Sequence, residues 1–245
     1  MEQSAAPVAR VRWRGAPERA EAVVLVLHGG RVDGTAPPGR RDPARLRMLP
    51  FVSALVRAGH GREPAVGEVV YRCRGWNGPR TDAARDAATA LDQTVAAYGR
   101  VPVVLLGHSM GGRAALRAAG HPSVVGVVAL APWWPTGEPC EQLADRRVAL
   151  VHGDTDRVTD PVQARQVALR AREAGAAVCG YSVPGGRHAM LRRAGDWHDT
   201  ATRLALGLLG LVPLPPEAEA ALELAGSDPR GLELPLPRGR RGLPG

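Results

Sequence analysis

The chain has 245 residues, a length that can bury the core of one domain but would cramp two. Its net charge of +8 reflects 32 basic residues, all of them arginine, which are scattered rather than gathered into a stripe with interleaved aromatic residues, so nucleic-acid binding is not expected. No apolar run approaches the roughly 20 residues of a membrane-spanning helix, so a membrane protein is not expected either.

The cysteines and the N-terminal residues favour a cytoplasmic protein. Cys73, Cys140 and Cys179 are odd in number and lack CxxC spacing, which fits a reducing compartment and argues against a disulfide framework or a zinc site. The first 14 residues contain no apolar stretch that resembles a signal peptide. The seven histidines never pair at i,i+4 with an acid between them, so no metal site is expected.

Short apolar runs alternate with helical patterns along the chain. This alternation is typical of a mostly parallel sheet that is covered by helices on both faces. We expect strands over residues 8–14, 22–27, 66–73, 101–106, 124–130, 148–151 and 178–183. We expect helices over residues 43–58, 82–98, 110–119, 161–174 and 196–209, with Pro50 interrupting or kinking the first of them.

These elements predict one domain over residues 1–212. The remainder, residues 213–245, is rich in Pro, Gly and acids and is expected to be a mobile or loosely docked tail, with a helical turn or two over 217–224. Only about 16 residues, 131–146, separate two of the expected strands. That length leaves room for a loop and one short helix, but not for an inserted lid domain.

A Gly-x-Ser-x-Gly pattern, Gly107-His-Ser109-Met-Gly111, lies between an apolar run and a helical pattern. In a nucleophile elbow the serine occupies a strained strand-to-helix turn, so its neighbours on both sides must be small. The turn exposes the hydroxyl and directs the free N–H groups of the helix start at the site, where they favour negative charge. A capping serine in a glycine-rich turn is the alternative, but the flanking strand and helix favour Ser109 as a nucleophile.

Acyl transfer forms a tetrahedral oxyanion that preorganised N–H donors must hold. One donor is expected to be the amide of Met110, the residue after the nucleophile. The other is expected after an earlier strand, where His28-Gly29-Gly30 lets the backbone approach a ligand. Gly30 is the first choice and Arg31 the alternative; an ordinary glycine turn would hold no oxyanion.

A serine hydroxyl needs a base to take its proton, and a histidine base needs an acid to fix its tautomer. Two acids, Asp154 and Asp156, lie in a tight turn after the strand expected at 148–151. Asp156 lies deeper in the loop and is the expected acid, whereas Asp154 is the alternative and is expected to shape the turn. A turn-and-cap role for both acids, without catalysis, is also open.

His188 follows two glycines after the last expected strand, in the kind of loop that a mobile general base requires. His198 is the rival, but its helical setting after Trp197 favours packing or exposure. Three other histidines flank glycines at strand ends and precede the acid, so they are expected to be supporting hydrogen-bond partners: His28, His108 and His152.

These four motifs, in this order, resemble the α/β-hydrolase superfamily, and the chain looks like a compact, esterase-like bacterial serine hydrolase without an inserted lid. The resemblance spans about residues 8–210. It implies the α/β-hydrolase fold, with an eight-stranded, mostly parallel sheet, and no cofactor. Because only about seven strands are found, one N-terminal strand is expected to be absent.

Together, the motifs predict a serine hydrolase that cleaves a small carboxylic ester, with a thioester or amide as the less favoured substrate class, through an acyl-enzyme. Acyl transfer to an acceptor other than water and non-catalytic ligand binding by the same fold are alternatives. The expected partner is a small acyl substrate, and the oligomeric state is left open. Trp76, Trp133 and Trp134 follow strands at the edge where such sites form and are candidates for a substrate pocket, with ordinary packing as an equal alternative.

Overall fold

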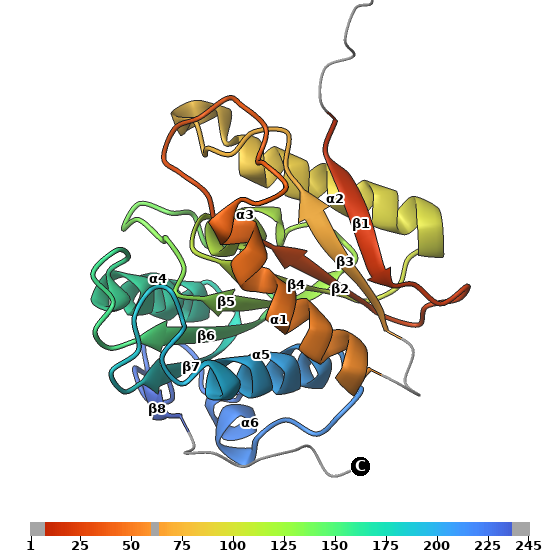
Figure 1. Cartoon of the computed structure of the whole chain (residues 1–245). Coiled ribbons are helices and arrows are strands. Elements are labelled where there is room, and N and C mark those ends of the chain that lie inside the picture. The colour runs from red at the N-terminus through yellow and green to blue at the C-terminus, as the bar shows by residue number, and fades with distance from the viewer. Residues whose placement is uncertain (1–7, 60–63, 237–245) are drawn as a thin grey trace, which may run out of the picture.

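The computed structural model describes residues 8–59 and 64–236. Within them, eight strands form one sheet in the order β1-β3-β2-β4-β5-β6-β7-β8 (Figure 1). The strands are β1 (Arg10–Gly15), β2 (Val23–Leu27), β3 (Ala65–Val70), β4 (Val103–His108), β5 (Val124–Leu130), β6 (Arg147–Gly153), β7 (Ala177–Val183) and β8 (Leu234–Pro235).

All neighbouring strands are parallel except the edge pair of β1 and β3, which is antiparallel. The central strands β2, β4 and β6 are almost entirely buried, as expected for parallel strands with helices on both faces. Because β2 to β8 run in the same direction, their carboxyl ends lie at one edge of the sheet. The loops that follow these strands therefore gather at that edge.

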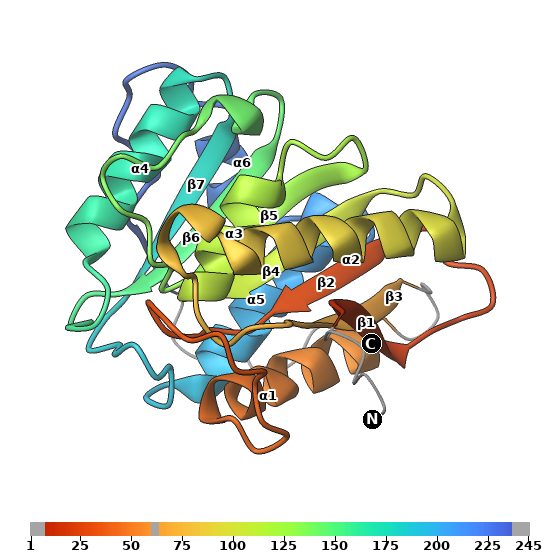
Figure 2. The same ribbon diagram turned by 90° about the horizontal axis from the view of Figure 1, so that it is seen from above.

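Helices cover both faces of the sheet (Figure 2). One face packs against α2 (Asp82–Tyr98), α3 (Met110–Ala118) and α4 (Pro161–Glu173), and the other against α1 (Pro43–Ala58), α5 (Ala194–Leu208) and α6 (Pro216–Leu222). Side chains alternate along a strand, so a central strand such as β2 contributes to the hydrophobic core on both faces of the sheet. In β2, Leu25 and Leu27 face the first group of helices, whereas Val24 and Val26 face the second. Two short 3₁₀ helices lie at Gly78–Arg80 and Glu141–Leu143.

The expected sheet with helices on both faces is confirmed, and most element bounds agree within a few residues. One part of a local expectation is wrong: Pro50 does not interrupt α1, which continues through it as a single helix. Pro50 lies on the exposed side of α1, as does Leu46, whose carbonyl loses its helical donor. Solvent can satisfy that carbonyl, so the proline is tolerated.

The segment after residue 212 is packed over residues 213–236 rather than loosely docked. Leu214 and the inner side of α6 are buried, and β8 pairs with β7 as the eighth strand. The buried guanidinium of Arg172 from α4 donates to the backbone carbonyls of Asp228 and Arg230 and thereby ties this segment to the sheet. The rest of the expected tail, residues 237–245, lies outside the described residues.

The eighth strand thus comes from the C-terminal segment. The described residues add no further N-terminal strand to the seven that were expected, and residues 1–7 lie outside them. None of the helices in residues 8–59 and 64–236 is both long and apolar enough to cross a bilayer.

Candidate active site

Four loops with the predicted functional residues meet at the carboxyl edge of the sheet (Figure 1). They follow β2, β4, β6 and β7, and all four strands run parallel within one sheet. The loops carry His28-Gly29-Gly30, Ser109, Asp156 and His188, respectively. Residues that are 32 and 79 positions apart in sequence therefore come within hydrogen-bond distance.

Ser109 occupies a strained turn between β4 and α3. Its backbone has φ 54° and ψ −119°, a conformation that non-glycine residues rarely adopt. A side chain at Gly107 would clash with the backbone of Gly111, and one at Gly111 would clash with the carbonyl of Leu27. The small neighbours therefore let helix, turn and strand approach closely, which leaves the serine side chain at the tip of the bend.

A continuous hydrogen-bonded path joins the serine to a histidine and an acid. Nε2 of His188 lies 3.1 Å from Oγ of Ser109, and Nδ1 of His188 lies 2.9 Å from Oδ2 of Asp156. Because a carboxylate only accepts, the path assigns the proton to Nδ1 and leaves Nε2 as the acceptor for the serine hydroxyl. The imidazole therefore presents its basic nitrogen to the alcohol.

The Asp156 carboxylate is fully buried and is surrounded by hydrogen-bond donors. Oδ1 accepts the amide of Val158 at 2.8 Å, and Oδ2 lies 3.2 Å from Nε2 of His152 and 2.9 Å from the Thr159 hydroxyl. Burial raises the pKa of Asp156, but the hydrogen bonds from His152 and His188 outweigh burial and hold the pKa well below its ordinary value. The acid thus stays ionised beside the imidazole.

The rival residues lie elsewhere. Asp154 is exposed, and its Oδ1 accepts the amide of Gly185 at 2.6 Å, so it holds the loop before His188 rather than the imidazole. His198 lies in α5, where its ring packs edge-on against Phe51 at 4.5 Å between ring centres. Neither residue joins the path to Ser109.

The loop with the predicted oxyanion donor, His28-Gly29-Gly30, follows β2 and contacts the start of α3; it is called the oxyanion loop below. A Cβ on Gly29 would lie 3.4 Å from Cβ of Ser109, so this backbone passes directly over the serine. The amide of Arg31 donates to the carbonyl of Arg74 at 2.9 Å, which commits that donor to the loop after β3. Of the two amides weighed from sequence, Gly30 is therefore the better candidate beside Met110.

The three tryptophans occupy different surroundings. The guanidinium of Arg113, one turn along α3 from Ser109, lies 4.1 Å from the ring centre of Trp76 and 4.5 Å from that of Trp133. Nε of Arg113 also donates to Glu138 at 2.8 Å. Trp134 is buried, and its indole N–H donates to the carbonyl of Gly112 at 3.1 Å. Trp133 is the least buried of the three tryptophans and thus the best placed to meet a ligand.

Sequence reasoning did not anticipate Thr159, Arg113 or Glu138. Thr159 contacts both Asp156 and His188, with its hydroxyl 3.2 Å from Nδ1 of the imidazole. Its position three residues after the acid, in a turn closed by Asp156, is a local signal that could have identified it. The Arg113–Glu138 contact spans 25 residues and carries no such signal.

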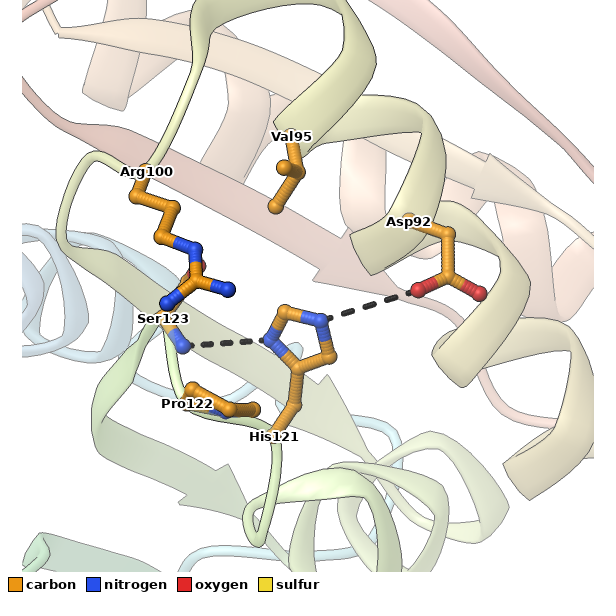
Figure 3. A pocket seen from close by; sticks show the side chains of 6 residues that line it. All are labelled: Asp92, Val95, Arg100, His121, Pro122 and Ser123. Atoms are coloured by element: carbon orange, nitrogen blue, oxygen red, sulfur yellow. Dashed lines mark hydrogen bonds and ion pairs between the residues drawn. The ribbon is translucent and has the colours of Figure 1, made fainter.

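Another histidine–aspartate pair lines a pocket at the opposite, amino edge of the sheet (Figure 3). The pocket has a volume of about 220 Å³ and is lined by Asp92, Val95, Arg100, His121, Pro122 and Ser123. Nε2 of His121 lies 3.7 Å from Oδ1 of Asp92, and Nδ1 of His121 accepts the amide of Ser123 at 3.2 Å.

Comparisons with known proteins agree with this fold. A family model for serine aminopeptidases of the S33 group matches residues 52–146. No curated protein sequence matches the chain significantly.

Solved structures share the fold at low sequence identity. A ferulic acid complex of Est1E from Butyrivibrio proteoclasticus is 13% identical with a TM-score of 0.60, over 82% of this chain and 96% of that one. A propionate-bound esterase from Thermogutta terrifontis is 17% identical with a TM-score of 0.60, over 83% and 88%. An alpha-beta serine hydrolase homologue from Coxiella burnetii is 15% identical with a TM-score of 0.57, over 79% and 90%.

The sheet and these likenesses define an α/β-hydrolase fold. The likeness to α/β hydrolases that the sequence motifs predicted is supported by the family model over residues 52–146, and solved structures of similar compact size share the fold. The fold class is confirmed as an α/β-hydrolase fold with a mixed, mostly parallel sheet. Between β5 and β6, where a lid could be inserted, the chain forms only a loop and the 3₁₀ turn at Glu141–Leu143.

Proposed function

We propose that this α/β hydrolase cleaves small carboxylic esters through an acyl-enzyme, with Ser109, His188 and Asp156 as its catalytic triad. The observation that carries the proposal is the unbroken path from Oγ of Ser109 through His188 to the buried Asp156 carboxylate. A path of this kind turns a weak alcohol nucleophile into one that can attack a carbonyl carbon.

In the acylation half, Oγ of Ser109 bonds to the ester carbonyl carbon while Nε2 of His188 takes the hydroxyl proton. The carbonyl oxygen gains the negative charge, and the amides of Gly30 and Met110 hold it. As the tetrahedral intermediate collapses, the bond to the leaving alcohol breaks and His188 returns the proton to that alcohol. Asp156 stabilises the imidazolium that forms in between.

Water then repeats the sequence on the acyl-serine. His188 removes a proton from the attacking water, the oxyanion forms again, and the bond between the acyl carbon and Oγ of Ser109 breaks as the serine regains its proton. The products are a carboxylic acid and the free enzyme. The same geometry would serve a thioester or an amide, with a different leaving group.

A small acyl group is favoured by the structural neighbours, one of which carries ferulic acid and another propionate in its structure. We assign Trp133, which is half-buried and donates its backbone amide to the Ser109 carbonyl, to a wall of the substrate pocket. The ring centre of Trp76 lies 6.2 Å from that of Trp133, and Trp76 shapes that wall. Trp134 instead stabilises the turn at Ser109 through its hydrogen bond to the Gly112 carbonyl.

The test is labelling with a fluorophosphonate probe, which reacts with activated serines, followed by rate measurements on p-nitrophenyl esters of increasing chain length. We expect the label on Ser109, and we expect Ser109→Ala to lose several orders of magnitude in kcat on every ester. Ser53→Ala, on the exposed side of α1, is the matched control and is expected to keep the wild-type rate.

Two outcomes would count against the proposal. Near-full esterase activity in Ser109→Ala would refute the nucleophile assignment, and absence of both labelling and turnover in the wild type would indicate a binding protein. Adding an alcohol or a thiol acceptor and analysing the products separates hydrolysis from acyl transfer.

A further inference from the structure

His108 is a buried histidine that the triad itself does not use. It is the last residue of β4, directly before Ser109, and its side chain is nearly inaccessible to solvent. Nε2 of His108 lies 3.0 Å from the backbone carbonyl oxygen of His188, which is 80 positions away in sequence. Because a carbonyl only accepts, Nε2 must carry the proton and donate it.

The same ring touches the other two catalytic segments. Its centre lies 4.8 Å from that of the His188 ring, with the planes tilted by 41°. A Cβ on Gly29 would lie 3.2 Å from Nδ1 of His108, so the ring also packs against the oxyanion loop. One side chain, at the end of β4 before Ser109, thus contacts both the loop that carries His188 (the base loop) and the oxyanion loop.

Asp156 and Thr159 restrain the His188 ring, whereas the other side-chain restraints on the loop that carries His188 act on the glycines before it. Gly185 has a φ of 64°, and Gly186 follows it, so the backbone before His188 can adopt a wide range of conformations. Asp154 binds the Gly185 amide at 2.6 Å and Thr155 binds the Gly186 carbonyl at 2.7 Å, which ties these glycines to the loop after β6. The hydrogen bond from His108 instead ties His188 itself to the strand that carries Ser109.

The charge state of the His108 ring is compatible with its contact to the loop that carries His188. Burial, followed by the nearby His188, lowers the pKa of His108 to about 3, so its ring is neutral near pH 7. A neutral ring does not repel the imidazolium that forms on His188 during the reaction. Nδ1 of His108 is buried without a hydrogen-bond partner among the described residues, as a neutral ring protonated on Nε2 allows.

We propose that His108 is a positioning residue whose Nε2–H group, bound to the His188 carbonyl, sets the separation between the base and the nucleophile. The inference rests on the proposed triad and deepens it. A contact of this kind acts on kcat more than on KM, because it sets the geometry of proton transfer rather than the binding of the acyl group.

The test compares three substitutions at residue 108. His108→Phe keeps a planar ring but removes the donor, His108→Gln places an amide donor near the position of Nε2, and His108→Asn is too short to reach the carbonyl. We expect kcat, counted per fluorophosphonate-reactive site, to fall about tenfold to hundredfold in the Phe and Asn variants, with KM within threefold of wild type. His108→Gln should recover most of that loss.

His198→Gln is the matched control, since His198 is a half-buried histidine away from the site, and it should leave kcat unchanged. If His108→Phe does not fold, the comparison of Gln with Asn carries the same information. Wild-type kcat in the Phe variant, or equal kcat in Gln and Asn, would overturn the positioning role. Failure of the proposed function looks different: the wild type itself would then show neither labelling at Ser109 nor ester hydrolysis.

Discussion

Two histidine–aspartate pairs among the described residues, His188–Asp156 and His121–Asp92, lie at opposite edges of the sheet and differ in every feature that matters for proton transfer. At the carboxyl edge, Nδ1 of His188 lies 2.9 Å from a carboxylate that is fully buried. At the amino edge, Nε2 of His121 lies 3.7 Å from the Asp92 carboxylate, whose side chain is 78% exposed (Figure 3). Residue types alone would not separate the two pairs.

The orientation of each ring explains the difference. The acceptor nitrogen of His188 faces the Ser109 hydroxyl, whereas the acceptor nitrogen of His121 is occupied by the backbone amide of Ser123. Only the first ring can accept a proton from an alcohol. The pair at His121 is a solvated turn contact, and exposed ion pairs of this kind contribute at most about 1 kcal/mol.

The environment of the acid adds a second difference. Asp156 compensates its burial with hydrogen bonds from two imidazoles, a hydroxyl and backbone amides, whereas Asp92 relies on water. A buried, fully hydrogen-bonded carboxylate can hold a ring in one tautomer, and an exposed one at 3.7 Å cannot. The comparison therefore predicts very unequal effects of the same substitution at the two sites.

The largest predicted effect is that of Asp156→Asn. The amide can donate to Nδ1 of His188 and so favour the tautomer with its proton on Nε2, which can no longer accept from Ser109. We expect kcat on a p-nitrophenyl ester to fall by about 10³- to 10⁴-fold, the size known for the corresponding change in a serine protease. Asp92→Asn is the control and should stay within twofold of wild type; more than a tenth of wild-type activity in Asp156→Asn would contradict the assignment.

The sequence allowed the fold and the order of the site motifs to be predicted because both rest on local signals. Buried parallel strands appear as continuous apolar runs such as 124–130, and strand-end motifs in parallel strands must meet at one edge. The two-residue strand β8 left no such signal, since it depends on pairing with β7 and on the contacts of Arg172. The contact between Arg113 and Glu138, which are 25 residues apart, also arises only in three dimensions.

The second predicted effect concerns the oxyanion loop, which has no counterpart at the His121 pocket. In Gly30→Ala the new Cβ would clash with Cε of Met110 and lie 2.5 Å from the carbonyl oxygen of Arg74, so the Gly30 backbone must shift. We expect kcat to fall by about tenfold to hundredfold, somewhat less than the loss of a whole oxyanion donor. Gly39→Ala meets no atom within 4 Å and should leave kcat unchanged; equal rates in both variants would remove Gly30 from the oxyanion site.

The third prediction concerns stability at acidic pH. The folded-state pKa of His108 is about 3, below its ordinary value of 6.5, so between these values the unfolded chain binds more protons than the folded one. The stability that depends on a neutral His108 is therefore fully present above about pH 6.5, and it is lost as the pH falls toward 3. Urea unfolding at several pH values should therefore show that the free energy of unfolding falls more steeply on acidification in the wild type than in His108→Gln. A difference between the two that does not change with pH would contradict the lowered pKa of His108.

The smallest predicted effect is that of His121→Gln at the amino edge. The substitution keeps a polar side chain beside the Ser123 amide and removes only a 3.7 Å contact with an exposed carboxylate. Since such contacts are weak, we expect kcat within twofold of wild type and a melting temperature within a few degrees. A tenfold loss of kcat in His121→Gln, with folding intact, would show that the pocket in Figure 3 influences the distant, proposed catalytic site. The two pairs would then differ in their distance from that site rather than in whether they affect activity.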